Sequence, residues 1–520
     1  MNFLRELPVL VLGLGDSGLA MVRWCVRHGA AVSVWDSREV PPQAETLARE
    51  FPGVALSNVL PPLDAFRLVL KSPGLSPHDT RVAALLQATR DSGVALLGEL
   101  DLFGHALHDL HAARGYAPKL VAITGTNGKT TTTAMTAMLI ERCGKRVASA
   151  GNIGPTMLDT LAAALDAGTL PEVWVLELSS FQLEGGGFGI DAGAHFAPDA
   201  AVVLNLSQDH LDWHATMHDY AAAKARLYTA LSPQGTVVLN RDDLQAMAMQ
   251  PVPPPPAKGV KARPIDRPSL HFGLNAPQRP GDFGLVTESG MAWLIRALPS
   301  EEPARRRKAG AGRNAEELHV QRLMPADALR IRGRHNAANA LAALALATAI
   351  GMPLAPMLHG LREYAGEPHR VQWVATVGDI DAFDDSKGTN VGATVAALEG
   401  LGAEKAPGKL VVVLGGDGKG QDFAPLAAPV QRHARAVALI GRDAALIEAA
   451  IRPAIGAAPH QRFQTLPEAV AWCFEQAQAG DAVLLSPACA SMDMFRDYTH
   501  RAEVFVNAVQ ALAADRGVIA

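Results

Sequence analysis

Cysteine is scarce in this 520-residue sequence, and neither sign of charge dominates. The four cysteines, Cys25, Cys143, Cys473 and Cys489, are scattered with no paired spacing, which excludes a disulfide framework and a zinc site built on cysteine pairs. The formal net charge is −5, so no electrostatic argument favours nucleic acid or an anionic membrane as a partner. The composition therefore predicts a protein of a reducing compartment that binds neither.

Long hydrophobic runs are also missing. The apolar segment near the N-terminus ends directly in a glycine turn, which is not the pattern of a signal peptide. The most apolar long stretch, residues 337–350, contains Asn339 and is too short and too rich in alanine for a membrane span. What is present is a globular composition, 48% hydrophobic and 19% charged, over a length typical of about three domains. We expect a soluble, cytoplasmic protein.

The segment VAITGTNGKTTTT, residues 121–133, has the pattern of a phosphate-binding loop. An apolar run predicts a buried strand that stops at Gly125, and a threonine-rich helix is expected to open at Thr130. Such a turn directs backbone N–H groups and a helix N-terminus at one point, which suits a polyphosphate. Lys129 would reach the β- and γ-phosphates, and the hydroxyl of Thr130 or Thr131 could hold Mg²⁺. The strict P-loop pattern needs one further glycine that this sequence lacks.

The first 113 residues open with a second glycine-rich turn. Gly13, Gly15 and Gly18 fit G-x-G-x-x-G between an apolar strand and a helix, and the next strand ends at Asp36. Taken alone this is the dinucleotide fingerprint, with Asp36 placed to bond a ribose hydroxyl. Any Rossmann-like turn that packs closely on a phosphate or sugar needs the same glycines. We interpret residues 1–113 as an α/β domain that binds a nucleotide-like group, with NAD and a purely structural turn as alternatives.

The stretch after the phosphate loop alternates strands with helices, which predicts a mainly parallel sheet. Residues 172–184 and 200–214 contain two further strands, and GNIG at 151–154 is a loop between elements. Ligands of such sheets bind at the carboxyl ends of the strands. Four polar side chains lie at or just beyond those ends: Glu177, Ser179, Asp209 and His210.

Residues 251–330 differ in character. A proline-rich segment and a basic segment containing RRRK flank HFGL and GMAWLI, which are predicted to be short strands of a hairpin-like excursion with flexible tips. We interpret RRRK as a solvated loop rather than a nucleic-acid patch. The helix RGRHNAANALAALALATAIG then closes the second unit. From about residue 367, four strands that each end in a polar or glycine-rich loop predict a third α/β unit.

Eight stretches, taken in chain order, resemble motifs of one enzyme family. They are GTNGKTTTT, ELSSFQLE, DHLDWH with the later AAAK, HNAANALAA, EPHR, DDSKGTN, GGDGKGQDF and SPACASMDMF. Together they resemble the Mur ligase family of cell-wall peptide synthetases, over essentially the whole chain apart from residues 251–330. GGDGKGQDF and SPACASMDMF are most similar to the motifs of the member that adds D-glutamate to UDP-N-acetylmuramoyl-L-alanine.

The resemblance implies an α/β fold in three domains. Residues 1–113 would form a Rossmann-like domain for the UDP-linked substrate, and residues 114–366 a central P-loop ATPase-like domain with a mainly parallel sheet and an insertion near 251–330. Residues 367–520 would form a Rossmann-like domain for the amino acid. The implied reaction uses ATP and two Mg²⁺ ions to convert the substrate carboxylate into an acyl phosphate, which the amine of D-glutamate attacks. ADP and phosphate are released, and a monomer is the family-like state.

The resemblance also implies the catalytic residues. Lys129 resembles the phosphate-loop lysine and Thr130 a hydroxyl on the Mg²⁺ side, whereas Glu177 resembles a carboxylate that helps hold the metal. His210 resembles a ligand of the second Mg²⁺. Lys224 resembles a lysine that carries a carbamate in this family. An ammonium group would be repelled by Mg²⁺, and a carbamate replaces its positive charge with an anionic oxygen ligand.

The other implied contacts form three groups. The ATP contacts are Gly125, Thr126, Asn127, Gly128, Lys129, Thr130, Thr131, Asn336, Asn339, Arg370 and Asp385. The contacts to the UDP-linked substrate are Asp16, Ser17, Ser37, Arg38, Gly74, Asn152 and Ser179. The D-glutamate clamp is Lys387, Thr389, Lys419 and Ser491, with Tyr498 where the family usually has phenylalanine.

Alternatives remain open for individual residues and for the function. By pattern alone Lys224 would be a solvated lysine on an amphipathic helix, and His210 would cap a strand end. Lys387 and Lys419 lie in glycine-rich loops, where a surface role is the alternative to binding the amino acid. The rival functions are another Mur ligase or a folylpolyglutamate synthetase, a nicotinamide dehydrogenase, and a non-catalytic nucleotide-binding module.

Overall fold

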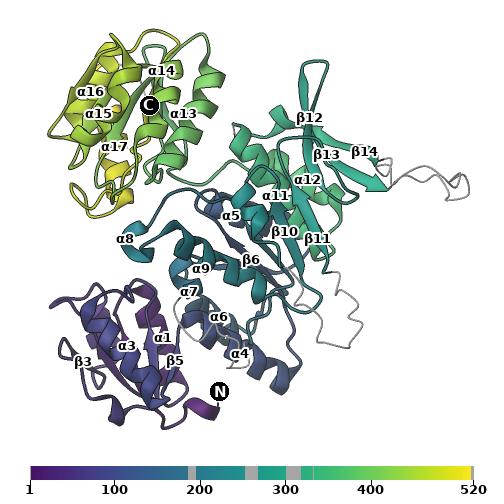
Figure 1. Ribbon diagram of the computed structural model, residues 1–520, viewed down its shortest axis with the longest axis vertical. Coiled ribbons are helices and arrows are strands. Elements are labelled where there is room, and N and C mark those ends of the chain that lie inside the picture. Colours follow the sequence, from purple (N-terminus) through teal and green to yellow (C-terminus); the bar gives the residue numbers. More distant parts are fainter. Residues whose placement is uncertain (1, 185–194, 252–266, 300–317, 332, 517–520) are drawn as a thin grey trace, which may run out of the picture.

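The apolar runs that precede the glycine-rich loops form parallel strands in the computed structural model (Figure 1). The structure describes residues 2–184, 195–251, 267–299, 318–331 and 333–516. The N-terminal and third domains lie at opposite ends of the long axis, with the central domain between them (Figure 1). The prediction of an α/β fold in three domains with mainly parallel sheets is confirmed. Within the described ranges, no helix is both long enough and apolar enough to cross a membrane.

The N-terminal domain has a five-stranded sheet in the order β3-β2-β1-β4-β5, and every neighbouring pair is parallel. Its strands are β1 (Pro8–Leu12), β2 (Ala31–Trp35), β3 (Ala55–Ser57), β4 (Leu68–Lys71) and β5 (Ala95–Leu97). Its helices are α1 (Asp16–Arg27), α2 (Ala44–Glu50), α3 (Thr80–Ser92) and α4 (Glu99–Arg114), of which α4 leads into the central domain. The predicted turn at Gly13 is real, because its φ is 85° and Gly18 packs against its carbonyl oxygen with no room for a side chain.

The central domain has a six-stranded parallel sheet in the order β11-β10-β9-β6-β8-β7. Its strands are β6 (Lys119–Thr124), β7 (Val147–Gly151), β8 (Val173–Glu177), β9 (Ala200–Val203), β10 (Thr236–Asn240) and β11 (Ser269–Phe272). Its helices are α5 (Lys129–Arg142), α6 (Met157–Asp166), α7 (Ser180–Glu184), α8 (Leu211–His214), α9 (Met217–Thr229), α10 (Leu244–Ala248), α11 (Arg334–Ala349) and α12 (Leu354–Glu363). Strand β8 is buried along its whole length, and β6 is buried after its first residue, as expected for a sheet that is covered on both faces.

The region 251–330 differs in part from the expectation. HFGL does not belong to an excursion, since β11 pairs in parallel with β10 and forms the edge of the central sheet. A strand of four residues has the same alternation in either setting, so the pattern alone could not decide this. The excursion is an antiparallel sheet of β12 (Phe283–Glu288), β13 (Met291–Pro299), which contains most of GMAWLI, and β14 (Leu318–Pro325). The RRRK run and nearly all of the proline-rich segment lie outside the described residues.

The third domain has a six-stranded sheet in the order β15-β16-β20-β17-β18-β19, parallel except for β15. Its strands are β15 (Gln372–Val377), β16 (Ile380–Asp384), β17 (Leu410–Gly415), β18 (Ala434–Ile440), β19 (His460–Arg462) and β20 (Ala482–Leu485). Its helices are α13 (Val391–Lys405), α14 (Ala427–His433), α15 (Ala444–Ile455), α16 (Leu466–Gln476) and α17 (Tyr498–Asp515). Each domain boundary proposed from the sequence, near residues 113 and 366, stays a prediction.

Candidate active site

The phosphate loop lies between β6 and α5, at the carboxyl edge of the central sheet. Gly125 and Gly128 have φ angles of 148° and 82°, which only glycine adopts without strain. A Cβ on Gly128 would come within 2.5 Å of the Asn339 side-chain oxygen, so α11 packs directly against the loop. The helix begins at Lys129, and the Lys129 ammonium donates to the carbonyl oxygens of Gly125 (2.9 Å) and Thr126 (2.7 Å).

Lys224 is buried under the same loop, contrary to the surface alternative. It is 1% exposed, and its ammonium donates to the Gly125 carbonyl oxygen at 2.9 Å and to the Thr124 hydroxyl at 3.3 Å. The ammonium also lies 4.5 Å from the ring centroid of Tyr220. Burial lowers the pKa of Lys224 well below its ordinary value, and the nearby Lys129 ammonium lowers it further. The side chain is therefore held towards its neutral amine form.

Glu177 ends β8 with a carboxylate that is 1% exposed. Its Oε1 accepts a hydrogen bond from the Asn152 side chain at 2.9 Å, whereas the buried Oε2 has no hydrogen-bond partner among the described residues. A buried carboxylate oxygen without a partner is costly unless a cation or donor completes it. The Glu177 Oε2 is thus available to a ligand.

His210 lies beyond β9 and directly before α8, in a left-handed backbone conformation with φ of 54°. Its Nε2 lies 3.5 Å from Asp209 Oδ2, and its ring packs against Phe181. Burial lowers the pKa of His210 to about 4, partly opposed by Asp209. The imidazole is therefore neutral at physiological pH, which is the form that binds metals.

Thr130, Glu177, His210 and Lys224 were the metal ligands implied by the sequence. Hydroxyl, carboxylate and neutral imidazole groups suit a hard divalent cation, and the unpartnered Glu177 oxygen fits that role. Lys224 as an ammonium does not fit, and only a carbamate would make it an oxygen donor. In the described part of the chain, no group of three or more His, Cys, Asp or Glu side chains could hold a metal ion by itself.

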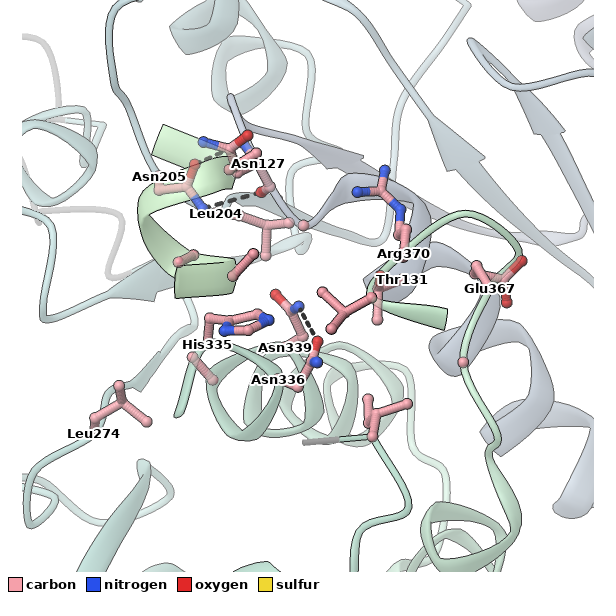
Figure 2. A pocket seen from close by; sticks show the side chains of 18 of the residues that line it. Asn127, Thr131, Leu204, Asn205, Leu274, His335, Asn336, Asn339, Glu367 and Arg370 are labelled. Atoms are coloured by element: carbon pink, nitrogen blue, oxygen red, sulfur yellow. Dashed lines mark hydrogen bonds between the residues drawn. The ribbon is translucent and has the colours of Figure 1, made fainter. Parts of the chain in front are cut away.

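A cavity between the central and third domains contains most of the residues expected around ATP (Figure 2). Its walls include seven of them: Asn127, Gly128, Thr131, Asn336, Asn339, Arg370 and Asp385. Asn339 donates to the Asn336 side-chain oxygen at 3.2 Å, and Arg370 donates to the Thr130 hydroxyl at 2.9 Å across the domain interface. Burial raises the pKa of Asp385 to about 7, and Ser486 donates to this carboxyl group at 2.6 Å.

Several cavity residues were missed by sequence reasoning. Asn205 and Asn240 follow or end strands β9 and β10, and His335 precedes Asn336 in the same motif. The rule that ligands bind at the carboxyl ends of parallel strands could have identified the two asparagines. His335 carried no such signal, because only the packing of α11 against the third domain turns it into the cavity.

A second cavity lies between the N-terminal and central domains. It brings together six residues that were expected to contact the UDP-linked substrate: Asp16, Ser17, Ser37, Arg38, Gly74 and Asn152. Ser179 does not line this cavity, but Gln182 does. The backbone N–H and the hydroxyl of Ser179 both donate to the side-chain oxygen of Gln182. Asp36 accepts hydrogen bonds from Arg38 and from the Leu14 backbone, so its carboxylate is already engaged within the protein. That arrangement disfavours the dinucleotide interpretation.

The expected D-glutamate clamp is only partly assembled. The Lys387 ammonium lies 5.4 Å from the ring centroid of Tyr498, and the Thr389 backbone N–H donates to the Lys387 carbonyl oxygen. Lys419 lies close enough to His210 for its charge to lower the pKa of that histidine. No hydrogen bond among the described residues joins Lys419 or Ser491 to Lys387. The contacts place Lys387 and Tyr498 together, and the clamp as a whole stays a prediction.

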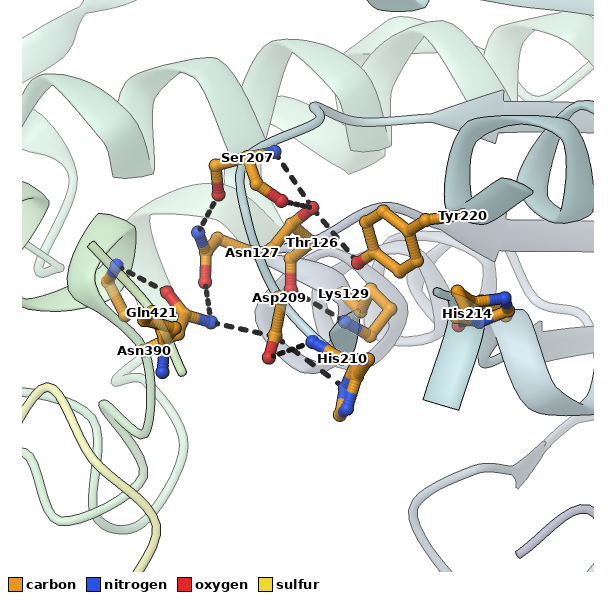
Figure 3. Close-up of polar contacts among 12 residues, drawn as sticks. Thr126, Asn127, Lys129, Ser207, Asp209, His210, His214, Tyr220, Asn390 and Gln421 are labelled. Carbon is orange, nitrogen blue, oxygen red and sulfur yellow. Dashed lines mark hydrogen bonds and ion pairs between the residues drawn. The ribbon is translucent and has the colours of Figure 1, made fainter. Parts of the chain in front are cut away.

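The third domain docks onto the phosphate loop through amide groups (Figure 3). The Asn390 side chain, at the N-terminus of α13, donates to Asn127 Oδ1 at 2.9 Å and to Asp209 Oδ2 at 3.2 Å. The Asp422 backbone N–H donates to the Gln208 side chain at 3.2 Å. These contacts join the third domain to residues that neighbour Lys129 and His210 in the chain.

Known proteins resemble this chain over its whole length. Family models match residues 8–98 (Mur ligase MurD-like, N-terminal domain), 123–258 (Mur ligase middle domain) and 369–489 (Mur ligase, glutamate ligase domain). A UDP-N-acetylmuramoylalanine–D-glutamate ligase from Albidiferax ferrireducens is 56% identical over 522 residues, covering 99% of this chain and 98% of that relative. The enzyme of the same name from Burkholderia mallei is 55% identical over 527 residues, with 99% of each chain covered.

Solved structures share the fold at low sequence identity. MurF ligase from Thermotoga maritima in complex with ADP has a TM-score of 0.58 at 16% identity, covering 98% of this chain and 96% of its own. UDP-N-acetylmuramate-alanine ligase MurC from Thermotoga maritima has a TM-score of 0.56 at 18% identity, covering 97% of this chain and 99% of its own. Full-length relatives above half identity, family models on all three domains and the shared three-domain fold agree, and the chain belongs to the Mur ligase family.

Proposed function

We propose that the protein joins D-glutamate to UDP-N-acetylmuramoyl-L-alanine with ATP, in the synthesis of peptidoglycan precursors. The observation that carries the proposal is that two cavities, one shared with each outer domain, both reach the carboxyl edge of the central sheet, where the phosphate loop lies. Asn152 lines the N-terminal cavity and donates to Glu177, while Asn127 and Gly128 line the opposite cavity. A UDP-linked carboxylate and a nucleotide could thus meet at the end of the central sheet.

The chemistry explains why cations gather there. A carboxylate is a poor electrophile, and phosphorylation by ATP gives an acyl phosphate that an amine can attack. This first step brings an anionic carboxylate against an anionic γ-phosphate. The half-buried Lys129 would offset that repulsion, because a positive charge in a site with little water stabilises the developing negative charge strongly. Arg370 would add a second positive charge from the third domain.

Thr130, Glu177, His210 and a carbamylated Lys224 would hold the two Mg²⁺ ions of the proposal. Bound there, Mg²⁺ would supply Lewis-acid polarisation of the phosphoryl oxygens. Glu177 suits this role because its second carboxylate oxygen is buried without a partner. The carbamate would form when the neutral Lys224 amine adds to CO₂, forming an N–C bond and releasing one proton. Burial beside Lys129 favours the neutral amine that this addition needs.

D-glutamate would bind on the third domain, close to the acyl phosphate. Lys387 and Lys419 would pair with its two carboxylates, and the hydroxyls of Thr389 and Ser491 would complete the receptor. Burial lowers the pKa of Lys387 to about 8, which still leaves it mainly cationic at neutral pH. Holding the substrates in line supplies a large part of the rate acceleration, on the order of 7–11 kcal/mol in favourable cases. The proposal includes a cytoplasmic, monomeric enzyme with no nucleic-acid or membrane partner.

The decisive experiment measures phosphate release by the purified protein with ATP, Mg²⁺ and UDP-N-acetylmuramoyl-L-alanine. We expect release only when D-glutamate is added, and no release with a Lys129→Ala variant. L-glutamate, L-lysine, diaminopimelate and a folate serve as matched acceptors. Equal turnover with any of these four acceptors would assign a different ligase, and no turnover with D-glutamate or with any of the four would reject ligation.

A further inference from the structure

Lys71 is a buried lysine that the mechanism above does not use. It ends β4 in the N-terminal domain and is 3% exposed. Its ammonium lies 5.5 Å from the ring centroid of Trp213 in α8, so it crosses from one domain towards the next. Its hydrogen bond to a protein atom is a long one, 3.4 Å to the carbonyl oxygen of Ser72. Lysines are almost never buried in this way unless they are paired.

No carboxylate of the described residues comes within ion-pairing distance of Lys71. Glu184 is the acidic group whose charge raises the pKa of Lys71. Its Oε2, however, lies 3.3 Å from the ring Nδ1 of His214 and forms no ion pair with Lys71. Burial lowers the pKa of Lys71 to about 8, with Glu184 opposing the shift. The side chain is therefore still mainly an ammonium at neutral pH. Burying an ammonium without an anion is costly, and the face of the Trp213 ring offsets only part of that cost.

The position of Lys71 indicates where an anion would come from. Ser72, the next residue, lines the N-terminal cavity, and its hydroxyl donates to the Gly13 carbonyl oxygen at 2.8 Å. On its other side Lys71 faces α8, which begins directly after His210. The ammonium thus lies at the border between the cavity for the UDP-linked substrate and the segment that carries His210.

We propose that Lys71 binds an anionic group of the UDP-linked substrate, either its diphosphate or its terminal carboxylate, and that Trp213 holds the ammonium in position for it. This inference rests on the proposed function and adds a residue that neither the motifs nor the glycine turn identified. The N-terminal domain would then contribute a charge to the substrate site in addition to the backbone N–H groups at the start of α1.

The test compares a Lys71→Met variant, which keeps the length of the side chain and removes its charge, with the unchanged protein. Affinity for UDP-N-acetylmuramoyl-L-alanine and for UDP is measured by calorimetry without D-glutamate. We expect Lys71→Met to bind the full substrate ~10–100-fold more weakly, the usual loss for a charge-assisted contact. Equal weakening for UDP assigns the diphosphate, and unchanged UDP affinity assigns the carboxylate. Wild-type affinity for the full substrate would overturn the inference.

Two controls separate the possible failures. Lys119→Met removes an exposed lysine that pairs with Asp199 far from the cavity, and it should bind like the unchanged protein. ATP affinity reports whether a variant is folded, and a Lys71→Gln variant replaces Lys71→Met if that affinity is lost.

Should both variants fail to fold, a pH titration of the unchanged protein tests the inference. Its affinity for UDP-N-acetylmuramoyl-L-alanine should fall between pH 7 and pH 9.5 as Lys71 loses its proton, and a flat profile for this full substrate would overturn the inference. If the unchanged protein does not bind the substrate, the proposed function fails instead.

Discussion

The two outer domains are attached to the central domain in opposite ways. The N-terminal domain shares one continuous apolar core with it, in which Leu19 and Phe103 belong to the same buried cluster as Trp174 and Val203. The third domain has two apolar clusters of its own, and neither contains a residue of the central domain. Its described contacts with the phosphate loop and its surroundings are polar, through Arg370, Asn390 and Asp422.

This difference indicates which part of the molecule can move. Separating the N-terminal domain would expose apolar surface at a cost of roughly 25 cal/mol per Å². Separating the third domain exchanges a few hydrogen bonds for water, which costs much less. We therefore expect the cavity between the N-terminal and central domains to keep its shape, and the cavity between the central and third domains to change when the third domain moves. Closure of that kind is common where the reaction must exclude water.

The largest expected effect concerns a residue that belongs to neither interface. Lys224→Ala should lower kcat at least ~10³-fold, because a buried group beneath the phosphate loop is removed from the reacting centre. Affinity for the UDP-linked substrate should stay unchanged, and short carboxylic acids should restore part of the activity. Lys145→Ala, an exposed lysine paired with Glu172, is the control. Full activity of Lys224→Ala without added acid would contradict both the role and the carbamate.

Core substitutions test the shared core directly by calorimetry. Phe103→Ala removes a buried ring that meets Trp174 edge to face at 4.9 Å, and Leu439→Ala removes a buried side chain in β18. Each should destabilise its own unit by ~3–5 kcal/mol. We expect two thermal transitions, one for the N-terminal and central domains together and one for the third domain. Phe103→Ala should lower only the melting temperature of the N-terminal and central domains, and Leu439→Ala only that of the third domain. A common shift in one transition would refute the division.

Glu99 should make the N-terminal attachment sensitive to pH. This buried carboxyl group accepts a hydrogen bond from the Leu158 backbone at 3.2 Å and interacts with Ser17, and burial raises its pKa to about 7 from the ordinary value of 4.5. The folded state then keeps a proton that the unfolded state has lost, so stability falls between about pH 4.5 and pH 7, by up to ~3 kcal/mol. Glu99→Gln should lack this fall, and its melting temperature relative to the unchanged protein should rise from pH 5 to pH 8. An equal difference at both pH values would count against the assignment.

The smallest expected effect is at the docking contact. Asn390→Ala removes two hydrogen bonds to the central domain, so kcat should fall ~10-fold, equivalent to ~1.4 kcal/mol. Affinity for the UDP-linked substrate should not change, because its cavity does not involve the third domain. Arg432→Ala, which removes an exposed pair with Glu399 in the same domain, is the matched control. A loss of substrate affinity in Asn390→Ala would mean that the two cavities are coupled.

Local features of the site could be predicted from the sequence, whereas features that depend on domain packing could not. The phosphate loop and the glycine turn are set by residues that are neighbours in the chain, so Lys129, Gly13 and the following helices lie as expected. Lys224 shows the limit. Its helix pattern alone indicated a solvated lysine, and only the packing of α9 beneath the loop buries it. The roles assigned to the site residues stay predictions.

The contacts of Asn390 could not be predicted either, because its partners Asn127 and Asp209 lie 263 and 181 residues away in the chain. No spacing rule relates such positions. The sequence predicted that a third α/β unit exists and which loops it carries, but not which of its side chains meets the phosphate loop. His335 and Lys71 were missed for the same reason, since each acquires its setting from another domain.

The amide bridge from Asn390 to Asn127 also suggests how the enzyme could be inhibited. A small molecule wedged between Asn390 and its two partners, Asn127 and Asp209, would have to displace two hydrogen bonds and no apolar core. It would hold the third domain away while leaving the UDP-linked substrate bound, and so trap an unproductive complex. At the opposite interface the existing cavity lies beside a continuous apolar core, so an inhibitor could separate those two domains only by breaking that core open.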